Sequence, residues 1–595
     1  MVATNEGRRA HRSGTKKSSR EPKAASLADT GEVANGTTAV PSGVRRAADA
    51  PRIDPPRVAA REAERRITSL AESVETLDSR ERLRRLARLV RKDGRNARRM
   101  AFLETAIGEC LDEVARPGSP AGRWTACEAA TWALAWMART KRAGGSAGGL
   151  LERLVGQARS AQALLASGDT QPTRFVLVLA HLFVDVEACR CLEAGAAATV
   201  AAEMERLVSA EGVPHLNGSS AMVERVVRWT AVREVASEIG GGAWSKPTEQ
   251  RWRAAATAVL RLLGGRGRAL AGAGRMPESL TAPLLDALAE CGSRRARTIK
   301  AVRRDQIGVD GQGLLGRDLH DAAASVAIIR TGWDRGSVRV MLDYRHPVPR
   351  LEIAVGDRLL VDGPWQWEAW ADGRSMEPEA GWTVSCWESD RKAAFLEITA
   401  PLGGGRHIER QVVVLPRDGI VLLADAVTTT TTTTSPAALR YRGILPLAAS
   451  LDAEAAAETC EVVVADTRPR MLALPLALPE WRAGGGGDLH ADSGTLVLSQ
   501  EGSNRLYAPI WLDCDARRIG RPLTWRQLTV ADTRIILPRH QAAGFRVQAG
   551  LDQWLVYRAL DAARNRTVLG CNVSCEFLVG RVRKSGEIAR TLEIQ

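Results

Sequence analysis

Side chains that could move a proton or hold an anionic ligand occur in three separate stretches of the chain. Histidine and tyrosine exchange protons in general acid–base catalysis, and arginine and asparagine donate hydrogen bonds to carboxylates. The candidates, in chain order, are His215, Asn217, Glu224, Arg225, Tyr344, His346, His407 and Arg410. Any shared chemistry therefore requires the fold to bring distant stretches together.

Each candidate also has a purely structural explanation. Tyr344 lies in or just after a predicted strand, where half-buried packing is common, and His346 lies in a predicted turn. Arg410 and Asp425 lie on neighbouring predicted strands and could simply pair across a sheet. His407 follows three glycines in a predicted hairpin, where solvent exposure is the ordinary outcome. The sequence leaves both kinds of explanation open.

Other chemistries lack their characteristic spacings. Cys189 and Cys191 form a C-x-C within a helical pattern, and Cys571 and Cys575 have no second pair at zinc-binding spacing. The glycine-rich residues 264–267 lack the G-x-x-x-x-G-K-S/T pattern of a phosphate-binding loop. Ten cysteines among 595 residues are also too few for a disulfide scaffold. We therefore predict no cofactor.

Positive charge is concentrated at one end of the chain. The net charge is +14, but residues 1–100 hold 24 Lys and Arg against 13 Asp and Glu, whereas the other residues hold 59 against 56. Residues 1–58 have hardly any large apolar side chain, so we predict a disordered basic tail there. The nearly neutral remainder argues against a specific nucleic-acid partner.

No targeting or membrane segment is visible in the sequence. Residues 1–58 lack the apolar stretch of a signal peptide, and the chain has no uncharged apolar run long enough to span a bilayer. We therefore predict a cytoplasmic protein without a membrane span, although export by another route is not excluded.

The elements that must position the candidates fall into two regions. Over residues 59–305 the apolar side chains recur at helical spacing, as in Val200, Met204, Leu207 and Val208. After that region the period changes to two, and short strands separated by turn residues follow one another without a convincing helix. We therefore predict an all-α domain over residues 59–305 and an antiparallel β domain over residues 306–595.

Three segments of the predicted β domain resemble the heparinase II/III family of polysaccharide lyases. Residues 325–334 read SVAIIRTGWD and are similar to the strand and RSGWD turn that open the family's β domain. Residues 342–363 contain LDYRH and then LEIAVGDRLLVDG, and residues 407–425 begin with HIER and end with IVLLAD. The order and spacing of the three segments agree with those of the family.

The resemblance implies a fold and an activity. The implied fold is multidomain, α then β, with an α/α toroid-like helical domain followed by a β-sandwich domain. The implied activity is β-elimination in an acidic polysaccharide or oligosaccharide, in which a base removes a proton beside a neutralised uronate carboxylate and an acid protonates the leaving oxygen. By the same resemblance, the catalytic candidates are His215, Tyr344, His346 and His407, and the substrate-binding candidates are Asn217, Glu224, Arg225 and Arg410. We expect His215 and His346 to face one groove between the two domains.

The sequence departs from the family at its catalytic tyrosine. The family segment D-G-x-H-x-E-x-S-x-x-Y aligns with residues 211–225, where the tyrosine position falls near Met222. The chain has four tyrosines, none of them before Tyr344. An unperturbed phenol has a pKa of about 10, so Tyr344 could replace the missing base only if a cation such as Arg345 or Arg410 lowered that pKa.

A zinc ion held by some family members is also not expected. His346 and Asp362 match two of its three ligands, but the position of the third, in residues 381–384, has no histidine. Two protein ligands make a poor structural zinc site.

Three functions remain open from the sequence. The chain could be a lyase with a reduced set of catalytic residues, or a catalytically degenerate relative that binds an acidic glycan. It could also be a scaffold tethered through its basic tail. The sugar, the linkage and the oligomeric state are not predicted.

Overall fold

The computed structural model describes residues 59–595 apart from short gaps. The gaps are residues 75, 92–96, 115–121, 139–145, 239–243, 272–273, 277, 305–312, 335, 430–436 and 483–484. The predicted basic tail (residues 1–58) and the predicted domain border between residues 305 and 306 lie outside the described residues.

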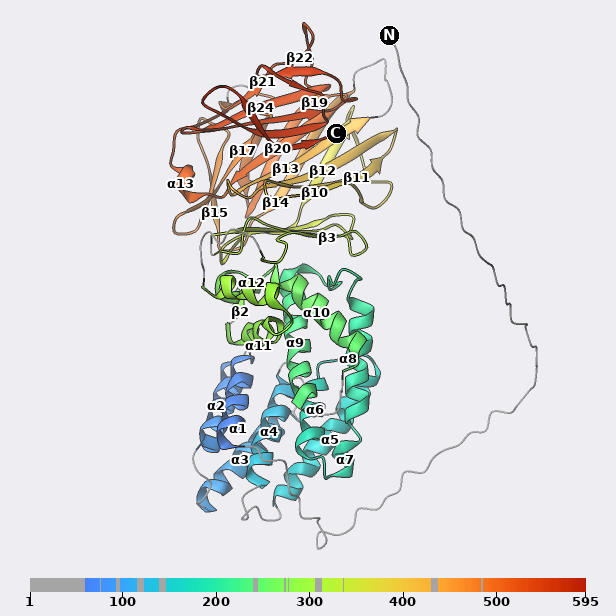
Figure 1. Ribbon diagram of the computed structural model, residues 1–595, viewed down its shortest axis with the longest axis vertical. Helices are drawn as coiled ribbons and strands as arrows, with labels where there is room; N and C mark the ends of the chain where they lie inside the picture. Colours follow the sequence, from blue (N-terminus) through green and yellow to red (C-terminus); the bar gives the residue numbers. More distant parts are fainter. Residues whose placement is uncertain are drawn as a thin grey trace, which may run out of the picture. The chain divides into compact units, whose positions relative to one another are not determined.

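Helices form the first part of the described chain (Figure 1). Their apolar faces are buried at the predicted spacing, as in Val200 and Met204, which are both 0% exposed. No helix among the described residues is long and apolar enough to cross a bilayer. The bounds are α1 (Ala60–Glu72), α2 (Leu77–Arg91), α3 (Ala97–Val114), α4 (Arg123–Ala138), α5 (Ser146–Ala166), α6 (Thr173–Leu182), α7 (Glu187–Arg190), α8 (Glu193–Leu207), α9 (Gly218–Glu238), α10 (Lys246–Leu260), α11 (Glu278–Ala289) and α12 (Ser293–Arg304), with a hairpin of β1 (Ala269–Ala271) and β2 (Gly274–Met276) between α10 and α11.

Antiparallel strands form the second part, which confirms the predicted order of α then β. The first sheet has the order β3-β4-β5-β6-β7, from β3 (Leu319–Asp321), β4 (Val326–Arg330), β5 (Val338–Asp343), β6 (Arg350–Val355) and β7 (Arg358–Pro364). We refer to it as the middle sheet.

The remaining strands form four further sheets. An eight-stranded sheet has the order β10-β11-β12-β13-β20-β17-β16-β15, from β10 (Thr383–Ser389), β11 (Ala394–Leu402), β12 (Arg406–Leu415), β13 (Ile420–Thr429), β15 (Asp452–Ala455), β16 (Val462–Ala465), β17 (Pro469–Pro475) and β20 (Leu506–Asp513). A five-stranded sheet has the order β18-β19-β14-β8-β9, from β8 (Gln366–Ala371), β9 (Arg374–Ser375), β14 (Ala438–Pro446), β18 (Gly487–Asp492) and β19 (Thr495–Ser503). The C-terminal sheet has the order β21-β24-β25-β28-β29, from β21 (Leu523–Leu528), β24 (Ala542–Ala549), β25 (Asp552–Ala559), β28 (Phe577–Val582) and β29 (Ile588–Ile594). The last sheet has the order β23-β22-β26-β27, from β22 (Val530–Asp532), β23 (Ile535–Ile536), β26 (Arg566–Val568) and β27 (Cys571–Val573). A four-residue helix, α13 (Ala516–Ile519), follows β20.

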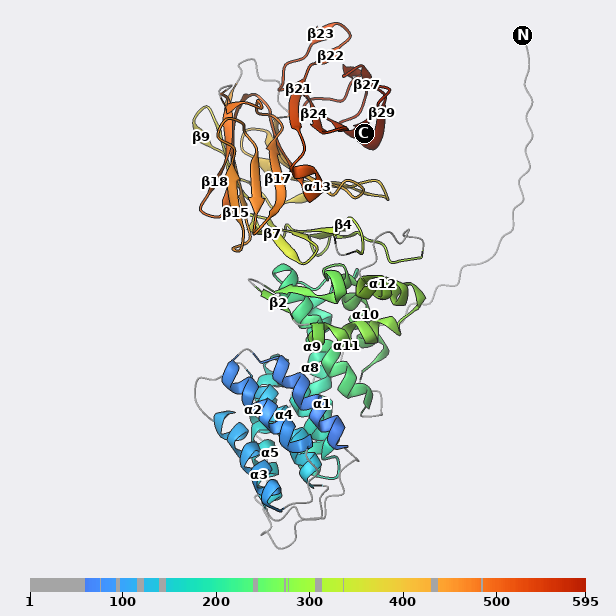
Figure 2. The ribbon, with the colours of Figure 1, turned by 90° about the vertical axis from the view of Figure 1, so that its left-hand side faces the viewer.

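The middle sheet is buried on both faces (Figure 2). In β4, Val326 and Ile328 belong to the core of the helical part, whereas Ala327 and Ile329 belong to the core of the sandwich. Successive side chains of a strand point to opposite faces of its sheet, so this alternation places helices on one face and strands on the other. The middle sheet therefore joins the two parts of the molecule.

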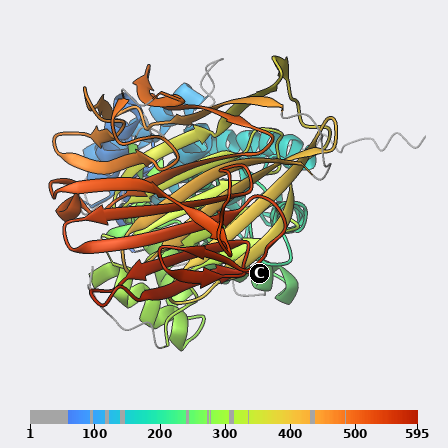
Figure 3. The same cartoon turned by 90° about the horizontal axis from the view of Figure 1, so that it is seen from above.

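The eight-stranded sheet repeats this arrangement one layer further along the chain. Val421 and Leu423 of β13 pack toward the middle sheet and its neighbours, whereas Leu422 and Ala424 pack toward the C-terminal sheet. Figure 3 shows the C-terminal strands, in red, as a layer over the earlier strands. Both faces of the large sheet are thus covered, which explains why its central strands are almost entirely apolar.

Two buried arginines fasten the middle sheet to the end of α10. Arg330 and Arg339 are cross-strand neighbours, 1% and 5% exposed. Arg330 donates hydrogen bonds of 2.8 Å to the carbonyl oxygens of both Arg261 and Leu263, and Arg339 donates one of 2.9 Å to that of Leu262. Carbonyl groups at a helix C-terminus carry partial negative charge, so they stabilise the two cations, to which no carboxylate of the described residues is bonded.

The RTGWD turn, which carries part of the family resemblance, holds Arg330 in place. The Trp333 ring lies 4.5 Å from the Arg330 guanidinium carbon, and Arg330 Nε donates to the carbonyl of Gly332 at 2.9 Å. Asp334 accepts from Gly336 N–H at 2.9 Å and closes the turn. Burial lowers the pKa of Arg330 well below its ordinary value of 12.5, so the charge depends on these acceptors. The role of the motif in this chain is structural.

Replacing Arg330 is expected to weaken the fold. Arg330→Met leaves buried carbonyl oxygens without donors, which costs about 2–4 kcal/mol of unfolding free energy. Urea unfolding followed by circular dichroism measures the change. Arg374→Met, at an exposed position of β9, is the matched control and is expected to change stability by less than about 0.5 kcal/mol. Equal stability of the two variants would contradict the docking role of Arg330.

Candidate functional site

A tight turn between α8 and α9 presents the first group of predicted residues. His215 N–H donates to the carbonyl of Leu207 at 2.7 Å, and Val208 pairs with Pro214 in an isolated bridge. Gly212 has φ +92°, and a Cβ at this position would lie 2.7 Å from the backbone of Ala254 in α10. The turn is therefore pressed against α10 and gives the segment that follows it a fixed direction.

The helical and β segments that carry the predicted residues meet through Arg345. Its Nη2 donates to the carbonyl of Leu216 at 3.0 Å and contacts Asn217 Oδ1 at 3.4 Å. The same guanidinium forms an ion pair with Asp343, which is 1% exposed. Arg345 thus contacts two residues that lie 129 and 128 positions before it in the sequence. The family resemblance likewise implies that these two segments lie close together.

Glu352 of β6 binds the N-terminus of α9. Its carboxylate accepts from Ser219 N–H at 3.1 Å, and the side chain is only 8% exposed. Gly218 has φ +84°, and a Cβ there would lie 3.0 Å from Glu352 Oε1. A carboxylate is stabilised by the partial positive charge of a helix N-terminus. Glu352 therefore positions α9 on the middle sheet.

The cations of this region already have anionic partners. Arg350 is paired with both Glu352 and Asp362, and Arg345 with Asp343. We call these five residues, together with His215, Asn217 and His346, the junction cluster. Its three carboxylates outnumber its two arginines, so the cluster is not a basic patch.

The three remaining polar side chains of the cluster are not equally accessible. Asn217 and His346 are exposed, whereas His215 is half-buried. His215 Nε2 is buried and has no hydrogen-bond partner among the described residues. A cavity of about 20 Å³ lies beside the cluster, lined in part by Ser219, Arg339 and Glu352. The opposition of His215 and His346 across a groove stays a prediction.

A histidine that sequence reasoning missed is bonded to Tyr344. His320 Nε2 lies 2.9 Å from Tyr344 Oη, and the His320 ring lies 5.0 Å from the ring of Trp387. His320 and Tyr344 lie on the sandwich face of the middle sheet, opposite the face that carries Asp343 and Arg345. The strand pattern could not reveal the pair because β3 is only three residues long.

The pKa of Tyr344 moves in the direction opposite to that required of a base. Burial, with a smaller contribution from the nearby Asp321 carboxylate, raises it to about 12. Arg345 is bonded to Asp343 instead, and Arg410 to Asp425. The condition set by the sequence, a Tyr344 pKa lowered by one of these arginines, is therefore not met, because both cations are paired with buried carboxylates.

The other three tyrosines are equally unsuited to proton abstraction. Tyr441, Tyr507 and Tyr557 are all buried in the sandwich, and burial raises the pKa of each of them. Met222, at the family's tyrosine position, is 0% exposed in the core of the helical part. Proton abstraction by a phenolate therefore has no support at any tyrosine of this chain.

The remaining predicted residues lie in separate surroundings. Arg410 is 0% exposed and forms a bidentate ion pair with Asp425, with Nε–Oδ1 and Nη2–Oδ2 distances of 2.8 and 2.7 Å. The Trp365 ring lies 3.9 Å from its guanidinium carbon. The pairing across the sheet, one of the two explanations open from the sequence, is thus the arrangement found. Arg410 is buried too deeply to contact a polysaccharide.

Glu224 and Arg225 of α9 form bonds within the helical part. Glu224 Oε1 accepts from Ser220 Oγ at 2.9 Å, and Arg225 is paired with Glu203, whose side chain is 4% exposed. His407 is half-buried at the start of β12, and no hydrogen bond or ring contact among the described residues joins it to the junction cluster. Of the eight predicted residues, the structure brings only His215, Asn217, Tyr344 and His346 into neighbouring segments.

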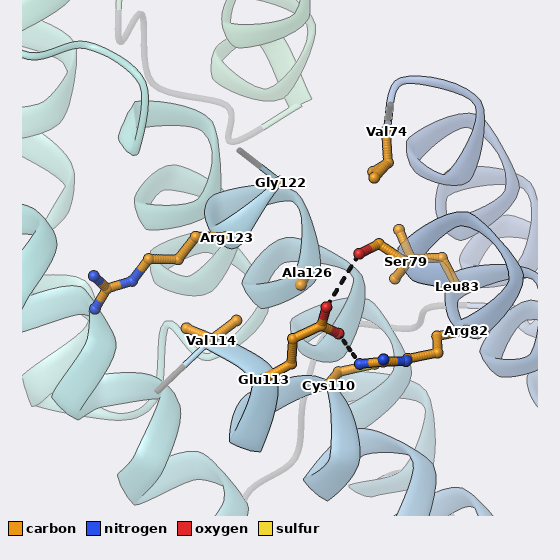
Figure 4. Close-up of a pocket in the computed structure, with 10 residues that line it drawn as sticks. All are labelled: Val74, Ser79, Arg82, Leu83, Cys110, Glu113, Val114, Gly122, Arg123 and Ala126. Atoms are coloured by element: carbon orange, nitrogen blue, oxygen red, sulfur yellow. Dashed lines mark hydrogen bonds and ion pairs between the residues drawn. The ribbon is translucent and has the colours of Figure 1, made fainter. Parts of the chain in front are cut away.

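A cavity within the helical part is too small for a sugar. It has a volume of about 20 Å³ and lies between α2, α3 and α4. In Figure 4, Glu113 points toward Ser79 and Arg82, to which it is bonded, whereas Arg123 points away. This volume holds about one water molecule, so the cavity is not a substrate site.

Solved structures with a similar fold include heparinases and a heparan sulfate lyase. The Heparinase III-BT4657 gene product aligns with a TM-score of 0.55 at 9% identity, covering 86% of this chain and 93% of that chain. A mutant of the heparan sulfate lyase HepC from Pedobacter heparinus aligns with a TM-score of 0.53 at 10% identity, covering 87% and 91%. A heparinase III crystal structure gives 0.53 at 8% identity, covering 87% and 93%.

The structural comparison thus detects a similarity to known proteins that the sequence comparisons do not detect. No protein-family model and no curated protein sequence matches the chain. The chain nevertheless has a divergent polysaccharide lyase fold, with a helical part followed by a β-sandwich. This result confirms the fold that the three resembling segments imply.

The His320–Tyr344 pair is expected to make stability depend on pH. Burial lowers the pKa of His320 below its ordinary value of 6.5. As the pH falls below 6.5, the unfolded chain therefore binds a proton at this histidine more readily than the folded chain does. The free energy of unfolding therefore decreases as the pH falls through this region. Urea unfolding between about pH 7.5 and pH 5 should show a smaller decrease for His320→Asn than for the wild type. The half-exposed His490, changed to Asn, serves as the control, and an unchanged profile in His320→Asn would refute the assignment.

Loss of the Glu352 charge is expected to loosen the helix–sheet contact. Glu352→Gln keeps the shape and an acceptor for Ser219 N–H but removes the charge at the N-terminus of α9, which costs about 1 kcal/mol of unfolding free energy. Glu368→Gln, whose side chain is 47% exposed in a surface pair with Arg442, should change stability by less than about 0.5 kcal/mol. Chemical denaturation of both variants at one pH tests the difference.

Proposed function

We propose that this chain binds an acidic polysaccharide or oligosaccharide at the junction cluster and does not catalyse tyrosine-dependent β-elimination. The observation that carries the proposal is that all four tyrosines are buried and have raised pKa values. A lyase of this kind needs a phenol near the uronate with a lowered pKa, whereas all four phenols here are buried with raised pKa values. The fold of proteins named as heparan sulfate lyases and heparinases supports the choice of ligand class.

The position and composition of the cluster support a binding role. It lies where the helical part meets the middle sheet, and both parts contribute exposed polar groups, Asn217 from one and His346 from the other. Arg350 also remains 36% exposed. These side chains could donate to sugar hydroxyls and carboxylates.

The charge of the cluster favours a lightly charged glycan. Both arginines are neutralised by carboxylates, and the third carboxylate leaves a small excess of negative charge. A densely sulfated chain would be repelled more strongly than a chain that carries only uronate carboxylates, because repulsion from the cluster grows with the negative charge of the ligand. We therefore propose a uronate-containing chain with few or no sulfate groups as the ligand.

A test of the proposal measures binding and product formation together. Purified full-length protein is titrated with hyaluronan, polygalacturonate, chondroitin sulfate and heparan sulfate by calorimetry, and each mixture is followed for the ultraviolet absorbance of an unsaturated uronate. The expected result is binding that is tightest for the unsulfated chains, with no absorbance from any. Tyr344→Phe should leave both readouts unchanged.

Matched variants locate the binding surface. Asn217→Ala and His346→Ala should each weaken binding by about 3- to 10-fold, as expected for the loss of one hydrogen bond worth about 1 kcal/mol. His490→Ala, on β18 outside the cluster, should not change it. Undiminished binding in both cluster variants, or failure of every glycan to bind, would contradict the proposal.

Histidine-based elimination is the second candidate, and one observation favours it. His215 Nε2 is buried and has no partner in the part of the chain that the structure describes, and its segment contacts the one carrying the exposed His346. If these imidazoles exchanged protons with a substrate, wild-type protein would release the absorbing product, and His215→Ala and His346→Ala would each abolish it. The absorbance assay therefore decides between the two candidates.

A further inference from the structure

A second pocket lies in the sandwich, among strands that do not contribute to the junction cluster. It has a volume of about 350 Å³ and is lined by residues of β19, β20, β21 and β24 and of the loop before β24. Figure 1 shows these strands near one another among the orange and red elements. The volume falls within the range of about 300–1,000 Å³ that is typical of small-molecule sites.

Two polar atoms of residues lining the pocket are buried without partners. Gln500 Oε1 and Arg505 Nε have no hydrogen-bond partner among the described residues. The Gln500 amide is oriented by its Nε2, which donates to the carbonyl of Tyr507 at 2.8 Å. Arg505 Nη2 donates to the carbonyl of Thr429 at 3.2 Å. One acceptor and one donor, each fixed by a neighbouring bond, thus remain unsatisfied.

A ligand that both donates and accepts hydrogen bonds could satisfy these two atoms. A buried polar atom without a partner costs about 1–3 kcal/mol, and a bound ligand could recover this. A hydroxyl group can donate to Gln500 Oε1, and a hydroxyl or carboxylate oxygen can accept from Arg505 Nε. The pair therefore favours a ligand that carries hydroxyl groups.

The charges around the pocket favour an anion. Its lining residues include Arg505, Arg539 and His540, against Glu501 as the one acidic residue among the described residues that line it. Burial, with a smaller contribution from Arg505, lowers the pKa of His540, so the positive charge at neutral pH comes from the arginines. The lining keeps a net positive charge, unlike the junction cluster.

The pocket also has an aromatic part. Tyr507 and Phe545 are among its lining residues, and their ring centroids lie 6.2 Å apart with the planes at 33°. Both side chains are buried, at 3% and 1% exposure, and belong to the core between the large sheet and the C-terminal sheet. A rigid apolar part beside convergent polar groups is the usual composition of a small-molecule site.

We propose that this pocket, which we call the sandwich pocket, binds one hydroxylated carboxylate of the size of a sugar acid. Arg505 and Arg539 hold the carboxylate, and Gln500 accepts from a hydroxyl group. The inference does not rest on the function proposed for the junction cluster, because the two groups of residues do not overlap.

The test titrates full-length protein with D-glucuronate by calorimetry, with D-glucose and acetate as comparison ligands. Glucuronate should bind at least about 10-fold more tightly than either, since glucose lacks the carboxylate and acetate lacks the hydroxyl groups. Equal binding of glucose would overturn the role of the arginines, and equal binding of acetate would overturn the role of Gln500. Absence of glucuronate binding would overturn the proposal.

Variants assign the binding to this pocket. Arg505→Met and Gln500→Leu should each weaken glucuronate binding by at least about 10-fold, and Arg534→Met, at an exposed position of the neighbouring hairpin, should not change it. If Arg505→Met and Gln500→Leu fail to fold, Arg539→Met still tests whether this pocket binds glucuronate. Arg539 is exposed and has no hydrogen-bond or ion-pair partner among the described residues, so its loss should weaken binding without lowering the melting temperature. Unchanged affinity in Arg539→Met and Arg505→Met would place the site elsewhere and refute the proposal.

Discussion

The structure depends on charge matching between the middle sheet and two helix ends. On its helical face, Arg330 and Arg339 meet the carbonyl groups that follow α10, and Glu352 meets the N–H groups that begin α9. Each charge faces the partial charge of opposite sign, so the sheet accepts this pair of helices in one orientation only. Apolar side chains between the charged positions then complete the contact, and the turn that carries His215 and Asn217 is held beside β5 as a result.

The residues that carry the resemblance to the lyases are largely those that dock the sheet. Arg330 and Trp333 of the RTGWD turn bind the end of α10, and Glu352 of the second segment binds α9. The third segment contains Arg410 and Asp425, which form a buried ion pair within the sandwich. Loss of the family's tyrosine leaves all of these contacts intact. The contacts that hold this fold together therefore do not depend on a tyrosine at that position.

The fold was predictable from local patterns, whereas the site was not. Helical and strand periods differ along the chain, so the order of α then β follows directly. Strand boundaries are less predictable, since residues 566–573 form two strands separated by a turn at Leu569 and Gly570, which both have positive φ. The site depends on contacts between distant residues, such as Arg345 with Leu216 and Asn217, and the pKa of the Tyr344 phenol depends on its burial. Neither the contacts between distant residues nor the burial of that phenol can be read from the local sequence.

The two-faced burial of the middle sheet has a consequence for how the molecule unfolds. Strands β4 and β5 supply side chains to the helical core and to the sandwich core from alternate positions. A shift of one residue in their register would exchange the two sets of side chains, so neither core tolerates an insertion within these strands. Detachment of the sheet would expose both cores at once. We therefore expect the helical part and the sandwich to unfold in one cooperative transition, in spite of their different architectures.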